Sequence, residues 1–158
     1  MSIHFSESDL LNIATGNERR GIAFYEVMAR SVDDETVSHT FLHLASMERE
    51  HILIFEEMLP EVGKSSPADM DPEYREYLQS LLDSAVFTDD LLTSELTVQA
   101  DTVAKALEVA IRAEKDAILF YYELRDLLPA RLGAIDRIIS EEKSHLRQLS
   151  ALKQGLGD

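Results

Sequence analysis

The sequence predicts an all-α protein built as a four-helix bundle, and three observations lead to this prediction. Apolar residues recur at alternating steps of three and four, which is the period of an amphipathic helix and not of a strand. Only 6 Gly and 4 Pro interrupt the 158 residues, so the residues that punctuate β-proteins are scarce. Hydrophobic residues make up 45% of the chain, which is enough for a packed core.

Start and stop signals mark a first helical pair over residues 6–60. Its first helix opens with a capping pattern, in which Ser6 is followed three residues later by Asp9. Its second helix starts near Asp33–Asp34, whose charges suit a helix N-terminus, and stops before Pro60. These signals predict two long helices joined by a tight turn.

A second helical pair is predicted over residues 101–155. Its first helix begins after Asp101, which we interpret as the N-cap, and ends at Leu128. Pro129 suits the first turn of the last helix, and Gly155 suits the C-terminal stop.

The crossover between the pairs, residues 61–100, is too long for a tight turn. It contains a segment of helical character, PEYREYLQSLLDSAVF. Such a crossover with its own short helix lets the second and third main helices run parallel. No Gly/Ser linker or charge tract divides the chain, so we expect one domain over residues 1–158.

Charge and cysteine content exclude several classes of function. The chain has 15 Lys and Arg against 30 Asp and Glu, for a net charge of −15, which repels nucleic acid and anionic membranes. The absence of Cys excludes disulfides, thiolate metal sites and iron–sulfur centres. The N-terminus lacks the pattern of a signal peptide, and the longest apolar run is too short to span a bilayer. We expect a cytoplasmic protein.

The inward stripe of each predicted helix is apolar at both ends and acidic in the middle. In the second and fourth helices a His follows the Glu one turn later on the same face. Buried carboxylates without partners cost several kcal/mol each or take up a proton. Two divalent cations would neutralise the four carboxylates, and these oxygen and imidazole ligands suit iron or manganese and tolerate zinc. The six candidate ligands are Glu18, Glu48, His51, Glu114, Glu142 and His145.

The two helical pairs also repeat one another. Residues 18–25 align with 114–121 at an offset of 96, counted from Glu18 to Glu114. Residues 48–51 align with 142–145 at an offset of 94, counted from Glu48 to Glu142. Two pairs of one design, facing each other across a pseudo-twofold axis, would each contribute three ligands to a central pair of metal ions.

The repeated motifs resemble those of rubrerythrin and its ferritin-like relatives over nearly the whole chain. One Glu from each of two helices and a Glu-x-x-His from each of the others is the ferritin-like di-iron pattern. The resemblance implies a ferritin-like bundle with two Fe ions per chain, for which Mn or Zn could substitute. It implies that Glu18 and Glu114 are terminal ligands, that Glu48 and Glu142 bridge, and that His51 and His145 each bind one iron. It also implies that Tyr25 and Tyr121 form hydrogen bonds to the site.

Three departures from the relatives shape the expected function. Rubrerythrin proper has a cysteine-ligated rubredoxin domain, so this chain needs an external electron donor, either a rubredoxin-like protein or a reductase. Ala117 stands where rubrerythrin has a further Glu, which leaves a symmetric ligand set closer to that of bacterioferritin. Arg49 stands where bacterioferritin has its haem-binding Met, so we expect no haem.

The resemblance implies an oxidoreductase that reduces hydrogen peroxide or dioxygen, and a homodimer. The symmetric ligand set and acidic surface leave a ferroxidase or iron-handling protein as the first alternative. The second alternative is a metal-binding bundle without catalytic activity. The purely structural alternative is a buried polar layer that fixes the register of the helices and binds no metal. No Lys or Arg occupies the inward stripes near the four acids, which disfavours this last interpretation.

Several polar residues lie off these stripes. His39 and His43 form an i, i+4 pair that we interpret as a solvated face. Arg112, Arg125 and Arg137 are candidate partners for the ligand carboxylates.

Overall fold

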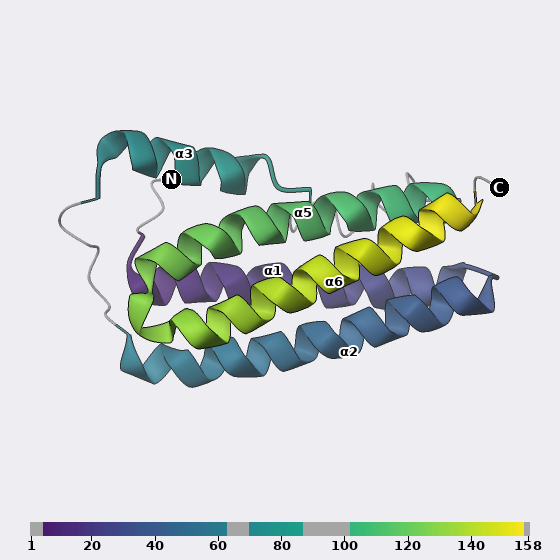
Figure 1. The fold of residues 1–158 in the computed structure, drawn as a ribbon, viewed down its shortest axis with the longest axis horizontal. Coiled ribbons are helices and arrows are strands. Elements are labelled where there is room, and N and C mark those ends of the chain that lie inside the picture. The colour runs from purple at the N-terminus through teal and green to yellow at the C-terminus, as the bar shows by residue number, and fades with distance from the viewer. Residues whose placement is uncertain (1–4, 63–69, 87–101, 157–158) are drawn as a thin grey trace.

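The computed structural model describes residues 5–62, 70–86 and 102–156. Every regular element in these ranges is helical, and the four long helices form a bundle (Figure 1). In chain order the elements are α1 (Glu7–Ser31), α2 (Glu35–Met58), the 3-10 turn η1 (Leu59–Glu61), α3 (Pro72–Asp83), α5 (Val103–Leu127), the 3-10 turn η2 (Pro129–Arg131) and α6 (Leu132–Leu156).

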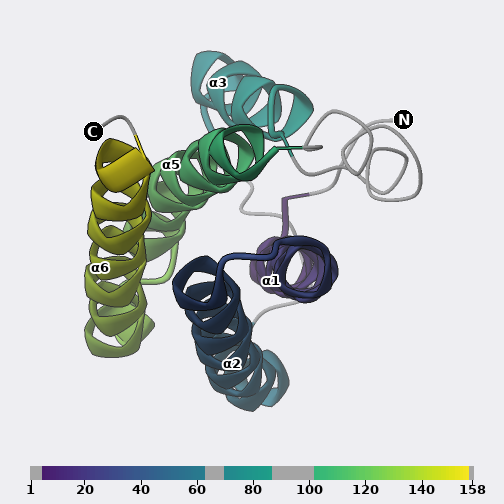
Figure 2. The ribbon, with the colours of Figure 1, turned by 90° about the vertical axis from the view of Figure 1, so that its right-hand side faces the viewer.

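The bundle consists of two antiparallel helical pairs, α1 with α2 and α5 with α6, each joined by a short connection (Figure 1). Helices α2 and α5 run in the same direction, as expected for a long crossover between them. The end-on view in Figure 2 places α3 outside the bundle, beside α5. The predicted all-α bundle with a short helix in its crossover is therefore confirmed.

Capping residues explain where the first helices begin. The Ser6 hydroxyl accepts a hydrogen bond from the Asp9 amide at 3.0 Å, and the Asp9 carboxylate accepts one from the Ser6 amide at 3.3 Å. This is the predicted capping box. Asp34 caps α2 by accepting from the Val37 amide.

Two predicted capping residues in the second pair are wrong, the N-cap of α5 and the C-terminal stop of α6. The N-cap of α5 is Thr102, whose hydroxyl accepts from the Lys105 amide at 3.2 Å, and the predicted cap Asp101 lies outside the described residues. Helix α6 starts after a 3-10 turn at Pro129 and continues through Gly155 to Leu156. Gly155 does not adopt a positive φ, so it forms no left-handed cap and the helix continues through it.

Apolar side chains pack in two clusters, one toward each end of the bundle. One contains Phe24, Phe41 and Leu107, and the other contains Phe55 and Leu124, all buried. Each large apolar side chain contributes roughly 1.5–3 kcal/mol when buried. The sequence positions of the four acids fall between these clusters, so apolar packing on both sides holds a polar layer at mid-height.

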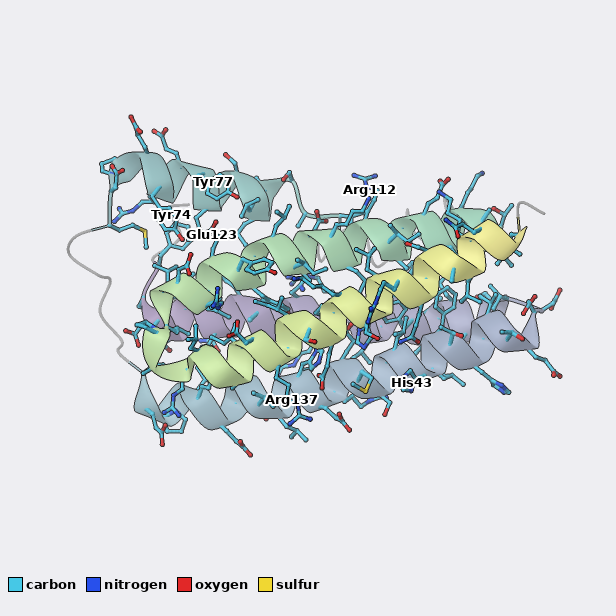
Figure 3. All side chains as sticks on the ribbon, viewed as in Figure 1. His43, Tyr74, Tyr77, Arg112, Glu123 and Arg137 are labelled. Atoms are coloured by element: carbon cyan, nitrogen blue, oxygen red, sulfur yellow. The ribbon has the colours of Figure 1, made fainter. Side chains whose placement is uncertain are left out.

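Helix α3 is anchored to α5 by Tyr74 and by the fully buried Leu78. Glu123, which lies off the inward stripe, accepts a hydrogen bond from the Tyr74 hydroxyl at 2.9 Å (Figure 3). Burial and this bond raise the pKa of Tyr74, so its hydroxyl stays a donor. Leu82 packs against the same apolar cluster, so among the described residues the crossover helix is held by one hydrogen bond and by apolar packing.

We expect Tyr74→Phe to lower the free energy of unfolding by about 1 kcal/mol, because the Glu123 carboxylate loses its donor. Urea denaturation measures this change. Tyr77→Phe is the matched control, because Tyr77 is 44% exposed on the same helix and should leave stability unchanged. Equal losses in the two variants would contradict the assigned anchor.

Within the described ranges, no helix has the length and apolar character that crossing a membrane requires. His39 and His43 are both exposed on α2, and Figure 3 shows His43 on the outer side of the bundle.

Candidate metal centre

The six predicted ligand side chains lie together at mid-height of the bundle. Each is at most 4% exposed. One Glu comes from α1 and one from α5, while α2 and α6 each contribute a Glu and a His three residues apart. A spacing of three places both side chains on one helix face. All four helices therefore contribute to one buried polar cluster.

The donor atoms form two overlapping groups, within each of which they lie within 4.8 Å of one another. We call the first group position A and the second position B. Glu48 and Glu142 belong to both groups, which is the arrangement that two bridging carboxylates require. Position A consists of Glu18, Glu48, His51 and Glu142, and position B of Glu48, Glu114, Glu142 and His145.

Both imidazoles direct Nδ1 at the carboxylates. His51 Nδ1 lies 3.0 Å from Glu142 and 3.5 Å from Glu18. The equivalent contacts of His145 Nδ1 are 3.9 Å to Glu48 and 3.8 Å to Glu114. The two rings stack with centroids 6.0 Å apart and planes 22° apart. The pseudo-twofold relation expected from the repeat thus extends to the ligand atoms.

Several of these donor atoms have no hydrogen-bond partner. They include Glu18 Oε2, both carboxylate oxygens of Glu142 and Nδ1 of both His51 and His145. Burying a polar group unpaired costs about 1–3 kcal/mol, and more for a charge. All five are atoms that bind metal ions, and they face one another. The donor set therefore fits a pair of divalent cations.

Two tyrosines cross the bundle to reach the outer carboxylates. The Tyr25 hydroxyl donates to Glu114, and the Tyr121 hydroxyl donates to Glu18, each at 2.5 Å. Each bond links α1 to α5, so each hydroxyl orients a carboxylate of the opposite helical pair. Burial and the neighbouring carboxylates raise the pKa of both tyrosines well above 10, which keeps the hydroxyls protonated.

Two functional neighbours were missed in the sequence. Glu141 lies 2.7 Å from His51 Nε2, and the Asn17 amide donates to the Tyr121 hydroxyl at 3.3 Å. Glu141 immediately precedes Glu142, so it lies about 100° around the helix, off the inward stripe and toward α2. The adjacent acids Glu141 and Glu142 were the one sequence feature that could have indicated a second carboxylate near the cluster.

The arginines proposed as partners of the ligands contact other acids. Arg137 Nε donates to Glu141 at 3.2 Å, and Glu141 in turn contacts the His51 ring. Arg125 pairs with Asp136 at 2.6 Å. In the described part of the chain, the electrostatic partner of Arg112 is Asp116, which lies away from the cluster.

A small pocket opens beside position B, between α1 and α5. It has about 220 Å³ of empty volume, including its open mouth. Small or short side chains line it, namely Asn17, Gly21, Ala113 and Ala117, and so do Glu48 and Glu114. The pocket is a route by which a small molecule could reach the cluster.

In the metal-free protein, burial and the charges of neighbouring groups shift the pKa values of the clustered side chains. Burial raises the pKa of Glu114, and the neighbouring Glu142 raises it further. Burial likewise raises the pKa of Glu142. Burial acts to lower the pKa of His51, but the Glu142 and Glu18 carboxylates outweigh it and raise the value to about 11. Burial lowers the pKa of His145.

We expect the metal-free protein to lose about 2 kcal/mol of stability between pH 6.5 and 9. Groups whose pKa is raised by folding bind more protons when folded, so stability falls as pH rises, which applies to Glu114, Glu142 and His51. The lowered pKa of His145 acts in the opposite direction, but only below about pH 6.5.

Urea denaturation in EDTA across this pH range measures the effect. Metal ions displace these protons, so the stability that added metal contributes should increase with pH. A metal-free protein whose stability rises from pH 6.5 to 9 would contradict the assigned shifts.

Comparison with known proteins identifies the family. Residues 9–153 match the rubrerythrin family model, which is most of the chain. The chain belongs to the rubrerythrin family. The resemblance expected from the motifs is thereby confirmed.

Two solved structures have a fold similar to that of this rubrerythrin-family chain. A crystal structure from Thermotoga maritima, described as a ferritin-like diiron-carboxylate protein, is 31% identical, with a TM-score of 0.72 and coverage of 98% of both chains. A hypothetical protein from Pyrococcus furiosus shares the fold at 19% identity, with a TM-score of 0.64 and coverage of 95% of this chain and 89% of the other. Comparison with curated protein sequences gives no significant match.

Proposed function

We propose that this protein is a di-iron carboxylate oxidoreductase of the rubrerythrin type, which reduces hydrogen peroxide or dioxygen with electrons from a separate donor protein. The observation that supports this most is the pair of overlapping buried groups that share Glu48 and Glu142. Two adjacent iron ions would supply one electron each, matching the two electrons needed to cleave the O–O bond of a peroxide.

The chain's own residues have distinct tasks in this proposal. Glu18 and His51 would hold the metal at position A, and Glu114 and His145 the metal at position B. The hydroxyls of Tyr25 and Tyr121 orient the outer carboxylates. All six ligand side chains are buried, which would keep bulk water from the centre, and the small pocket beside Glu114 would give a small oxidant access.

The electron donor is proposed to be a second protein. The 158 residues contain no Cys, so no thiolate-ligated iron centre lies within them. A rubredoxin-like protein or a reductase fits the requirement for one-electron delivery. For hydrogen peroxide, two electrons and two protons yield two molecules of water.

Stopped-flow mixing of the di-ferrous protein with hydrogen peroxide or with dioxygen tests the proposal. We expect rapid oxidation by peroxide, followed by repeated turnover when a rubredoxin and its reductase are added. Protein loaded with Zn²⁺ is the control, because zinc has no redox chemistry. Much faster oxidation by dioxygen than by peroxide would exclude the peroxidase form of the proposal, and absence of turnover with either oxidant would exclude the enzyme.

A ferroxidase or iron-handling function is the second candidate, because Ala117 leaves the ligand set symmetric and the net charge of −15 attracts Fe²⁺. This function predicts uptake of many iron ions per chain into an assembled cage. Aerobic iron titration followed by size-exclusion chromatography separates the two candidates. Saturation at two ions per chain in a small oligomer would count against iron storage.

A further inference from the structure

The repeat that relates the two helical pairs is broken at two residues beside the metal centre. At the offset of 94 that relates Glu48 to Glu142, Glu141 corresponds to Met47. At the offset of 96 that relates Glu18 to Glu114, Asn17 corresponds to Ala113. Both polar members of these pairs form hydrogen bonds at position A. The apolar members, Met47 and Ala113, occupy the equivalent places in the sequence repeat.

At position A, a carboxylate contacts the His51 ring nitrogen that lies away from the cluster. Its Nε2 lies 2.7 Å from the Glu141 carboxylate, and Arg137 donates to the same carboxylate at 3.2 Å. A neutral His51 that donates from Nε2 presents the Nδ1 lone pair to the carboxylate cluster. At position B, Met47 has no oxygen to accept from a ring, and among the described residues no carboxylate contacts His145 Nε2.

Tyr121, which donates to Glu18 at position A, is likewise fixed by a hydrogen bond from a neighbouring side chain. The Asn17 amide donates to the Tyr121 hydroxyl at 3.3 Å, and this hydroxyl donates to Glu18 at 2.5 Å. Tyr25 makes the corresponding bond to Glu114, but Ala113 has no side-chain amide that could donate to the Tyr25 hydroxyl. Two chains of hydrogen bonds therefore fix the ligands of position A, one through its His and one through its outer Glu.

The pocket adds an independent difference between the two positions. It lies beside Glu114 and Glu48, and Ala113 is among the residues that line it. The Ala113 methyl group, which corresponds to the side-chain amide of Asn17 in the repeat, forms no hydrogen bond in this pocket. Among the described residues, position B is thus the less supported position, and its outer ligand Glu114 lines this pocket.

We propose that the two metal positions are inequivalent, with position A binding its ion first and more tightly and position B holding the weaker, exchangeable ion that faces the pocket. This inference rests on the proposed metal centre. Glu141 is then a positioning residue that acts through His51. Partners of this kind behind a ligating His typically change metal affinity by about 10- to 100-fold.

Calorimetric titration of the metal-free protein with Zn²⁺ tests the inference without any need for turnover. Wild-type protein should bind two ions in two resolved steps. Glu141→Gln should weaken the tighter step by about 10- to 100-fold and leave the weaker step within about twofold. Glu57→Gln, which changes an exposed acid on α2, is the matched control and should alter neither step. Circular dichroism checks that each variant remains helical.

Asn17→Ala provides a second variant, should Glu141→Gln fail to fold, and it should also weaken only the tighter step. Crystals grown with one equivalent of Zn²⁺ locate the first ion, since anomalous differences at the zinc edge should be larger among Glu18 and His51 than among Glu114 and His145. Equal peaks, or equal weakening of both steps, would overturn the inference while leaving the metal centre intact. A protein that binds no Zn²⁺ would overturn both.

Discussion

Replacing Glu142 by Gln is expected to stabilise the metal-free protein and to destabilise the metal-loaded protein. Glu142 is fully buried, and neither of its carboxylate oxygens has a hydrogen-bond partner. Burial and the nearby Glu18 raise the pKa of Glu142 by more than Glu114 and His51 lower it, so its charge is unfavourable on balance when no metal ion is bound. Gln has nearly the same shape, carries no charge and can donate to neighbouring carboxylates.

The expected gain in the metal-free protein is about 1–3 kcal/mol, because one buried charge is removed. The metal-loaded protein should lose stability, because Glu142 belongs to both positions and its loss weakens both ions. Metal content should fall from the proposed two ions per chain to below about one. Urea denaturation with EDTA and with saturating metal, together with elemental analysis, measures these opposite effects.

Glu57→Gln is again the matched control, since Glu57 is exposed on α2 and should change neither form. The decisive result of this experiment is that the free energy of unfolding increases in the metal-free protein and decreases in the metal-loaded protein. A Glu142→Gln protein that is destabilised in both forms would show that Glu142 has a favourable partner other than a metal ion.

Tyr25→Phe is expected to slow the proposed peroxide reduction by about 10- to 100-fold and to weaken the proposed metal binding at position B. The variant removes the hydroxyl that donates to Glu114 at 2.5 Å, so this carboxylate can turn away from the metal. The raised pKa of Tyr25 assigns it the task of a protonated donor that orients Glu114. Stopped-flow rates and Zn²⁺ titration measure the two losses separately.

Tyr122→Phe is the control for this variant. Tyr122 lies on the same helix as Glu114 but is 37% exposed, and Lys143 lies over its ring, 5.0 Å from the centroid. Removal of its hydroxyl should change neither the rate nor the affinity. If Tyr25→Phe were as active as Tyr122→Phe, the assigned role of the Tyr25 hydroxyl would be wrong.

The ligand cluster was predictable because all its members lie on inward helix faces. A Glu in the middle of an apolar stripe is visible in the sequence once the helical period is known, and Glu48 and His51 share a face by spacing alone. The bundle and its parallel middle helices followed from the same period and from the length of the crossover. Local capping was predictable at Ser6, where both partners lie within one turn.

Contacts between helices were less predictable. Glu141 lies off the inward stripe of α6, and only the packing of α6 against α2 brings it to His51. Asn17 reaches Tyr121 across α1 and α5 for the same reason. The end of α6 was misplaced because a Gly stops a helix only when its backbone turns to positive φ, and Gly155 does not do so.

Anomalous X-ray diffraction at the iron edge tests the central claim most directly. Crystals of protein purified without oxygen should show two iron peaks inside the bundle, roughly 3.5–4 Å apart. One peak should lie among the donor atoms of position A and the other among those of position B. An empty cluster in protein supplied with iron, or iron bound only at the surface, would contradict the account.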